Sequence, residues 1–542
     1  WVNAIAIILG VMGKLGDTSP RRSPGPARLW WSAHWYGITV FSALLTALII
    51  RSVWSVTPAM NASGTHEWDL TGGSDPWYMM RAVEYILAQH NHFLIDMDRS
   101  YPLGAINPRP PLFAWSMALG GMLLAPILDV PAEEAVWWSV AALPVIYGAL
   151  TVLPMASIGR RFFSKGTGAV AAWLIALMPG HVSKSTFAMS DHDAFVILFL
   201  TLGFYFWLKA VEAAGSDRIV PKASWRPSYF FKGVKATLEQ RPTAVSNAIL
   251  AGFAFATVAL GWKGFVYGLA ILYAAFFTQV LLNMFRRRDS MALTVAALAM
   301  MVSAFLIPLP FYAHMELKLV WDASGFQPMF YILAFTFVTG YIASASRDLP
   351  WLVIAGPAII GMLIIAGGVN FSIEWYFGAL AACLLFIWMF LVSNESKISP
   401  QRVVVVLGII GVAGWFIVDV LKDTSAWEVL FTGGYYFSKN KIFGTIAEAQ
   451  APSRGMLFGS FGPLVALLAI GAGIVALLQG VRKQDRVKLV LAVWMLVAGF
   501  MAWSAGRFVF NATPPVAVMG AWSITLLWGI CGGHKFAKSW RR

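Results

Sequence analysis

The sequence predicts an all-α protein that crosses a membrane many times. Of its 542 residues, 58% are hydrophobic and only 12% are charged, whereas soluble domains average about 45–50% apolar and about 25% charged residues. The mean hydropathy is +0.68, and apolar runs recur near the length of about 20 residues that a membrane-spanning helix needs. Apolar surface in this excess must face lipid, so we expect a polytopic membrane protein with about 12–14 transmembrane helices.

Basic residues are grouped in short clusters between the apolar runs, as in the cytoplasmic loops of membrane proteins. The clusters lie at 160–165, 213–243, 286–288, 397–402 and 482–488. With the N-terminus inside, every cluster falls in the cytoplasm if the apolar run at 113–129 is an interfacial helix. The net charge of +14 therefore reflects membrane orientation, and we expect no nucleic-acid partner. Cys383 and Cys531 are far apart in apolar surroundings, which argues against a disulfide framework or zinc site.

This orientation divides the chain into inner, membrane and outer parts. We expect a cytoplasmic N-terminal segment at 1–35, a first transmembrane helix at 36–56 and a first external loop at 57–133. A transmembrane bundle follows at 134–421, then an external loop at 422–456. Transmembrane helices at 457–542 end in the cytoplasm. Acidic residues that need an explanation lie on the outer side, in the external loops and near 181–191.

Two acidic motifs precede helices on the outer side. Asp75 stands between a serine and Pro76, which is typical of a helix start, so a plain helix cap explains it when it is taken alone. Asp191 and Asp193 flank His192 at the start of an apolar run, where unpaired carboxylates are costly. Capping accounts for one of these two carboxylates, and cation binding is the alternative for the pair.

Two further candidate functional residues lie on the outer side of the membrane. Glu448 ends a Thr-Ile-Ala-Glu stretch in the last external loop, where a single glutamate is usually solvated. Arg507 lies at the outer end of an apolar run, and it either extends to the interface or binds a phosphate through its paired N–H groups. Together, oxygen ligands from separate segments suit Mg²⁺ or Mn²⁺, and a nearby arginine suits a phosphate leaving group.

In this order, the motifs resemble those of the oligosaccharyltransferase catalytic subunit, of the single-subunit archaeal or bacterial type. Asp75 in Ser-Asp-Pro-Trp-Tyr resembles the first acidic motif of that family, and Asp191 and Asp193 resemble its Asp-X-Asp motif. Thr-Ile-Ala-Glu, ending at Glu448, matches its Thr-Ile-X-Glu motif, and Arg507 resembles the arginine that holds the lipid-linked phosphate. The stretch 101–112 also resembles the first external loop of the family. The resemblance implies a fold of the polyprenyl-phosphate-dependent glycosyltransferase (GT-C) type.

The resemblance also implies a reaction at the external face of an archaeal or bacterial cell membrane. A glycan would pass, with inversion, from a polyprenyl (dolichyl) phosphate or pyrophosphate carrier to the amide nitrogen of Asn in Asn-X-Ser/Thr. Asp75 and Glu448 would accept the amide N–H groups of an acceptor polypeptide. The same two acids, with Asp191 and Asp193, would hold Mn²⁺ or Mg²⁺.

Three further residues receive roles from this comparison. Arg507 and Lys184 would bind the lipid-linked phosphate. His192 is an additional candidate metal ligand, although in a helical start its ring would point away from the two aspartates. The lipid bilayer, the lipid-linked oligosaccharide and the acceptor polypeptide are the partners that the resemblance implies.

The sequence departs from the family pattern at two places. Lys184, seven positions before Asp191, stands where the family usually has arginine, and lysine keeps the charge but loses the forked geometry. The Trp-Trp-Asp-Tyr-Gly motif is absent, because Trp30-Trp31 and Trp137-Trp138 are followed by other residues. That motif belongs to an external domain after the last span, so we expect the domain to be missing from this chain.

Three alternatives remain open at this stage. Another polyprenyl-phosphate-sugar glycosyltransferase, such as a protein O-mannosyltransferase, would also place acids in its first external loop. An ion-coupled transporter would place acids near the bilayer midplane and show internal repeats. A non-catalytic scaffold is favoured only if the chain naturally lacks the external domain.

Overall fold

The computed structural model describes residues 26–61, 69–99, 101–107, 109–224, 226–314, 326–348 and 450–532. The N-terminal half contains one short hairpin among helices, namely α2 (Pro26–Asn61), α3 (Ser74–Gln89), β1 (Ile95–Asp96), β2 (Ala105–Ile106), α4 (Pro111–Leu128), α5 (Ala132–Leu150), α6 (Val152–Phe162), α7 (Lys165–Leu177), α8 (Pro179–Val182), α9 (Asp193–Ala214), α10 (Pro227–Gln240) and α11 (Pro242–Gly261). The rest comprises η1 (Lys263–Phe265), α12 (Val266–Phe285), α13 (Met291–Leu306), α14 (Leu309–His314), α15 (Phe326–Ala345), α22 (Arg454–Phe461), α23 (Pro463–Arg482), α24 (Arg486–Ser504), η5 (Gly506–Phe508), η6 (Phe510–Ala512) and α25 (Thr513–Ile530).

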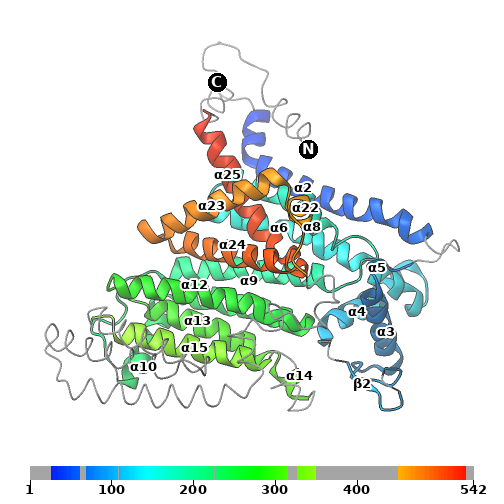
Figure 1. Ribbon diagram of the computed structural model, residues 1–542, viewed down its shortest axis with the longest axis horizontal. Coiled ribbons are helices and arrows are strands. Elements are labelled where there is room, and N and C mark those ends of the chain that lie inside the picture. The colour runs from blue at the N-terminus through cyan, green and yellow to red at the C-terminus, as the bar shows by residue number, and fades with distance from the viewer. Residues whose placement is uncertain are drawn as a thin grey trace, which may run out of the picture.

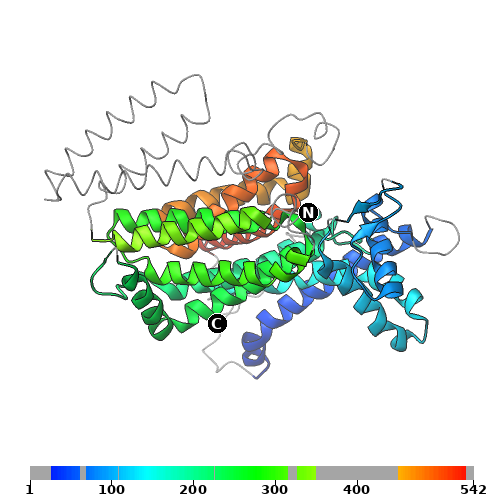
Figure 2. The ribbon, with the colours of Figure 1, turned by 90° about the horizontal axis from the view of Figure 1, so that it is seen from below.

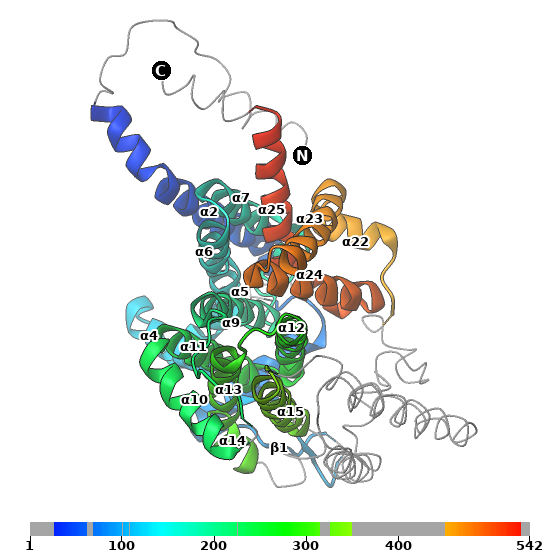
Figure 3. The same ribbon diagram turned by 90° about the vertical axis from the view of Figure 1, so that its left-hand side faces the viewer.

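The long helices pack into a membrane-type bundle, which confirms the predicted fold class. Within the described residues, nine helical stretches are long and apolar enough to cross a membrane. Helices α9, α12, α13, α15 and α24 run side by side along one direction (Figures 1 and 3). The first of the nine apolar stretches, Trp30–Val53, lies within α2, which extends beyond the expected 36–56. Residues 349–421 of the expected bundle are outside the described part of the chain, so the total of 12–14 stays a prediction.

Small and aromatic side chains hold the helices together. Helix α11 contains several buried alanines, and Gly203 of α9 leaves room for the Phe255 ring of α11, since a Cβ there would stand 2.7 Å from that ring. Phe204 of α9 stacks on Trp494 of α24, with ring centroids 3.9 Å apart. Small residues allow close approach between helices in lipid, where water does not drive helix association. Close packing of small and aromatic side chains therefore holds these helices together.

The basic loops meet at one end of this bundle. Arg161 pairs with Glu212 at 2.8 Å, and Arg241 pairs with Asp217 at 2.7 Å. Arg486, at the start of α24, donates to the carbonyl of Gly215, which follows α9. Three of the five basic clusters, at 160–165, 213–243 and 482–488, are thus on one side, as the charge pattern predicts.

The first predicted external loop forms a small unit at the opposite end. Here α3 packs on α4, and the β1–β2 hairpin pairs Ile95 with Ile106. The side-chain amide of Asn107, after β2, donates to the carbonyl of Phe93, before β1, at 2.8 Å and so closes the open end of the hairpin. Helix α4 is long and apolar enough to cross a membrane, but it lies beside α3 at this end (Figures 1 and 2). That position agrees with an interfacial helix, which stays a prediction.

Candidate active site

Backbone hydrogen bonds join the segments that carry the described site residues, in two pairs. Thr71, before α3, donates its backbone N–H to the carbonyl of Ala188 at 2.9 Å, which joins the Asp75 region to the Asp191 region. Gly506, beside Arg507, donates its N–H to the carbonyl of Gln450 at 2.9 Å. Glu448 is outside the described residues, and Gln450 is the first described residue after it.

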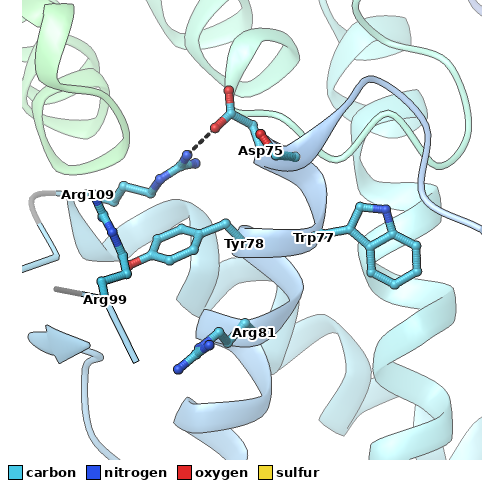
Figure 4. A pocket seen from close by; sticks show the side chains of 7 residues that line it. Asp75, Trp77, Tyr78, Arg81, Arg99 and Arg109 are labelled. Carbon is cyan, nitrogen blue, oxygen red and sulfur yellow. Dashed lines mark hydrogen bonds and ion pairs between the residues drawn. The ribbon is translucent and has the colours of Figure 1, made fainter. Parts of the chain in front are cut away.

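Asp75 pairs with Arg109 and does not cap its helix. Gly73, at φ 94°, is the N-cap of α3, and no side chain bonds to the first turn. The hypothesis of a plain helix cap is therefore wrong. The Asp75 carboxylate instead accepts from the Arg109 guanidinium, which lies 5.0 Å from the centre of the Tyr78 ring (Figure 4). Half of the Asp75 side chain remains exposed, so it is open to a substrate.

This ion pair lies in an open pocket of about 580 Å³ between α3 and the hairpin. The pocket is lined by Ser74, Asp75, Trp77, Tyr78, Arg81, Arg99 and Arg109. Arg81 is held by the buried carboxylate of Asp96 at 2.9 Å. Arg99 lies over Tyr78 at 5.6 Å (Figure 4). The walls of the pocket therefore combine aromatic faces with guanidinium groups, a mixture suited to polar and anionic ligands.

Asp191 and His192 form a partly buried ion pair before α9. The His192 ring nitrogen Nδ1 is 2.6 Å from the Asp191 carboxylate, which also accepts the His192 backbone N–H at 2.8 Å. The ring stacks on Trp262, with centroids 6.0 Å apart. The expectation that the ring points away from both aspartates was wrong, because the turn before α9 lets it fold back onto Asp191.

The pair shifts the pKa of both groups. Burial alone would raise the pKa of Asp191, but attraction to His192 and two hydrogen bonds from it lower that pKa below its ordinary value. Burial opposes protonation of His192, yet the charge of Asp191 raises its pKa above the ordinary value. The charge of Arg109 also acts on His192, where it lowers the pKa. Arg109 is thus close enough to influence both acidic motifs.

Asp193 and Lys184 form a second pair on the same segment. Asp193 is the first residue of α9, and one of its carboxylate oxygens is 3.3 Å from the Lys184 ammonium. About a quarter of each side chain is exposed. Lys184 therefore neutralises a candidate metal ligand in this structure, and its expected contact with a phosphate stays a prediction.

Arg507 is held by a short 3₁₀ turn between α24 and α25. Phe508 anchors this turn by stacking on Tyr267 of α12, with ring centroids 5.5 Å apart and planes 13° apart. Helix α24 ends at Ser504, so Arg507 stands after its last turn and at the start of the next apolar stretch, Gly506–Ile530. That placement suits a residue that meets a ligand at the membrane surface.

The predicted site residues offer the type of donor atom that a hard divalent cation prefers. Asp75, Asp191 and Asp193 offer carboxylate oxygens, which Mg²⁺ and Mn²⁺ prefer. In the part of the chain that the structure describes, no group of three or more acidic, histidine or cysteine side chains is close enough to hold a metal. Each of the three acids is instead paired with a basic residue, so the predicted convergence on one ion stays a prediction.

Arg109 is the site residue whose role sequence reasoning missed. It stands in Asn-Pro-Arg-Pro-Pro, a stretch that the resemblance covered without assigning a function to the arginine. The two neighbouring prolines restrict the backbone on both sides of it. A charged residue at such a rigid position in an external loop was the signal in the sequence that could have indicated a role for Arg109.

Comparison with known proteins agrees with this arrangement. Residues 41–348 match the family described as oligosaccharyl transferase STT3, N-terminal. A dolichyl-phosphooligosaccharide-protein glycotransferase 3 of Archaeoglobus fulgidus is 26% identical over 311 residues, which cover 56% of this chain and 32% of that protein. The STT3 subunit of the dolichyl-diphosphooligosaccharide–protein glycosyltransferase of Saccharomyces cerevisiae is 20% identical over 64% of this chain and 44% of its own length.

The fold also matches a solved structure. The oligosaccharyltransferase AglB of Archaeoglobus fulgidus, in complex with an inhibitory peptide and a dolichol-phosphate, superposes with a TM-score of 0.66. It is 19% identical, and the match covers 93% of this chain and 52% of AglB. This chain thus spans between a third and about half of the length of these relatives. Because the family match covers more than half of the chain, the protein belongs to the oligosaccharyl transferase STT3 family.

Proposed function

We propose that this chain carries the reaction centre for transfer of a glycan from a dolichyl phosphate or pyrophosphate carrier to asparagine in Asn-X-Ser/Thr. The observation that supports the proposal is the linkage of three segments in an STT3-type bundle: Thr71 near Asp75 bonds to Ala188 near Asp191, and His181 stacks on Phe510 near Arg507. Arg109 bonds to Asp75, and its charge also acts on His192. The proposed active site is on the external face of the membrane.

Asp75 would act on the acceptor amide. Resonance makes the asparagine nitrogen a poor nucleophile, and complete loss of such resonance costs about 18–20 kcal/mol in backbone amides. Asp75 and Glu448 would each accept one amide N–H and hold the nitrogen partly twisted. The nitrogen then attacks the anomeric carbon, the bond to the carrier phosphate breaks, and one carboxylate takes the amide proton. Gln450, the first described residue after Glu448, bonds to Gly506 beside Arg507, and this contact supports the proposed role of the Thr-Ile-Ala-Glu segment.

Arg507 would receive the phosphate end of the carrier. A guanidinium forms two parallel charge-assisted hydrogen bonds to phosphate, which suits both recognition and stabilisation of the leaving charge. Asp75, Asp191 and Asp193, with Glu448, would hold Mn²⁺ or Mg²⁺, whose chemistry is to offset negative charge on the phosphate. Lys184 and His192 would exchange their present carboxylate partners when such an ion binds, and Lys184 would then be available to the phosphate.

The transporter alternative is disfavoured by the positions of the acids. Asp75 and Asp193 lie in the first turns of their helices, and Asp191 precedes α9, whereas coupling-ion sites of transporters lie near the midplane. A transfer assay with a dolichyl-linked glycan and a fluorescent Asn-X-Thr peptide tests the proposal. Asp75→Asn should abolish transfer, while Asp129→Asn, at an exposed carboxylate after α4, should not. Full activity of Asp75→Asn would overturn the proposed role of the site.

A further inference from the structure

Arg51 is a charged residue inside the bundle that the proposed reaction does not use. Its side chain is completely buried (0% exposed), and in the described part of the chain none of its hydrogen-bond partners is a carboxylate. The guanidinium donates to Ser185 Oγ at 2.8 Å, to His181 Nδ1 at 2.7 Å, and to the carbonyls of Ala47, Ala176 and Ile175 at 3.1, 2.9 and 3.4 Å. A buried charge in a membrane protein needs such a full set of partners and usually marks a function.

The carbonyl partners explain why the charge is stable there. Helix α7 ends at Leu177, and the carbonyl of Ile175 would normally accept from residue 179, which is a proline without an N–H. The last carbonyls of a helix lack intrahelical partners and carry the negative end of its dipole. Arg51 therefore supplies the donors and the positive charge that the end of α7 requires.

His181 extends this contact toward the Arg507 segment. Arginine can only donate, so His181 Nδ1 must accept, and the ring proton must be on Nε2 of a neutral imidazole. The ring is fully buried and stacks on Phe510, with centroids 5.9 Å apart and planes 22° apart. Phe510 is in η6, three positions after Arg507. His181 thus connects Arg51 to the turn that carries the candidate phosphate ligand.

The segment that leads to Asp191 is also held by the backbone of residue 51, beside the side-chain bond from Arg51 to Ser185. The backbone carbonyl of Arg51 accepts from Phe187 N at 3.0 Å, and Ser185 Oγ donates to the carbonyl of His181 at 2.7 Å. The next residue, Ala188, has a left-handed φ of 66° and accepts from Thr71 N at 2.9 Å. Gly148 of α5 leaves the space for this contact, since a Cβ there would stand 2.6 Å from Ser185 Oγ and 3.0 Å from Arg51 Nε.

We infer that Arg51 and His181 are a positioning pair that sets the Lys184–Asp193 segment in place relative to both Asp75 and Arg507. One guanidinium is bonded to the end of α7, to the loop that contains Lys184, and to the ring that packs against the Arg507 turn. Neither residue is at the reaction centre, so each acts through its neighbours. The catalytic consequence rests on the proposed function, whereas the structural consequence can be measured without it.

Hydrogen–deuterium exchange of the full chain in lipid nanodiscs tests the structural part. Arg51→Met should speed exchange in peptides that cover 69–79, 181–193 and 505–512, and Arg51→Lys should have a smaller effect because lysine keeps the charge without the fork. The matched control is Arg347→Met. Arg347 is equally buried but pairs with Asp289 at 2.8 Å at the other end of the bundle, so its loss should affect 215–226 and leave the three active-site peptides unchanged. Faster exchange confined to the end of α7 in Arg51→Met would overturn the inference.

Two substitutions of His181 separate positioning from general packing. His181→Asn keeps an acceptor near Nδ1, and His181→Phe keeps the ring on Phe510 but leaves the Arg51 donor without an acceptor. Exchange in the 181–193 and 69–79 peptides should be near wild type in His181→Asn and faster in His181→Phe, and the reverse order would contradict the inference. In a transfer assay His181→Phe should lower kcat by about 10²-fold, as a misplacement near 1 Å does, with KM for the peptide little changed. Faster exchange with no transfer by wild type would reject the proposed function and leave the positioning pair standing.

Discussion

Arg109 and Asp75 form an ion pair across 34 positions of sequence, and the same guanidinium lies over the ring of Tyr78. The contact joins the start of α3 to the segment after β2, and both side chains line the pocket shown in Figure 4. Because both side chains are partly exposed, the pair contributes little to stability. We therefore expect loss of the pair to lower the transfer rate, because the pair positions the Asp75 carboxylate.

Arg109→Gln should lower the transfer rate by about 10²-fold, the usual cost of a misplaced reacting group, while the melting temperature changes little. Arg99→Gln is the matched control, because Arg99 stacks on the same tyrosine ring but forms no ion pair with Asp75. Transfer rates and thermal unfolding should be measured on the same preparations. Equal rates for the two variants would show that the contact with Asp75 has no role.

Glu448→Gln should reduce transfer by about 10²–10³-fold, as loss of one preorganised electrostatic partner does. Glutamine keeps the shape but loses the charge that both amide binding and cation binding need. Glu67→Gln and Asp69→Asn, in the segment before the first acidic motif, should remain active in the same assay. If Glu448→Gln is as active as these controls, the glutamate has no part in the reaction.

Arg507→Ala should weaken binding of dolichyl phosphate, and Arg507→Lys should recover only part of the affinity because the two-pronged geometry is lost. A titration of the full chain in nanodiscs measures this directly. Arg482→Ala removes an arginine from the opposite end of the bundle and should leave the affinity unchanged. A loss in Arg482→Ala equal to that in Arg507→Ala would point to a general effect of positive charge.

The Asp191–His192 pair predicts a pH-dependent stability. The pKa of His192 is raised in the folded chain, so its contribution is complete below about 6.5, the ordinary value, and is lost as the pH rises through the folded pKa. The pKa of Asp191 is lowered, so its contribution is complete above about 3.9 and disappears only in stronger acid. In chelator-containing buffer, the difference in melting temperature between wild type and His192→Gln should therefore be larger at pH 5.5 than at pH 9. A difference that grows toward pH 9 would mean that the pair is not ionic.

Gly148→Ala should destabilise the chain by about 1–3 kcal/mol, the cost of overpacking a filled interior. An added Cβ would stand 2.4 Å from the Ser185 Cβ and 3.0 Å from Arg51 Nε. Gly471→Ala is the control, since apart from its chain neighbours and the backbone of its own helix no described atom is within 4 Å of a Cβ built there, and alanine is the better helix former. Thermal unfolding should show a loss for Gly148→Ala and a small gain for Gly471→Ala, and equal shifts would contradict the close packing of Arg51.

The sequence predicted several features of the fold because these features depend on composition or on the order of residues along the chain. The membrane bundle follows from apolar content, and the grouping of the basic loops at one end follows from counting charges between the apolar runs. Arg161, Arg241 and Arg486 meet at that end as expected. The acidic residues could be identified because a charge beside an apolar run is costly unless it has a partner. All of these signals can be read along the chain without knowing which helices are neighbours.

The partners of the site residues were decided only by the tertiary structure. Asp75 pairs with Arg109, 34 positions away, and His192 turns onto Asp191 while its ring stacks on Trp262. The burial of Arg51 against His181 and Ser185, 130 and 134 positions later, has no signal in the sequence beyond a charge inside an apolar run. Composition and spacing determine that such charges must be satisfied. Which groups satisfy them depends on how the helices pack, because hydrogen bonds and ion pairs form only between atoms that the fold brings within about 3 Å of each other.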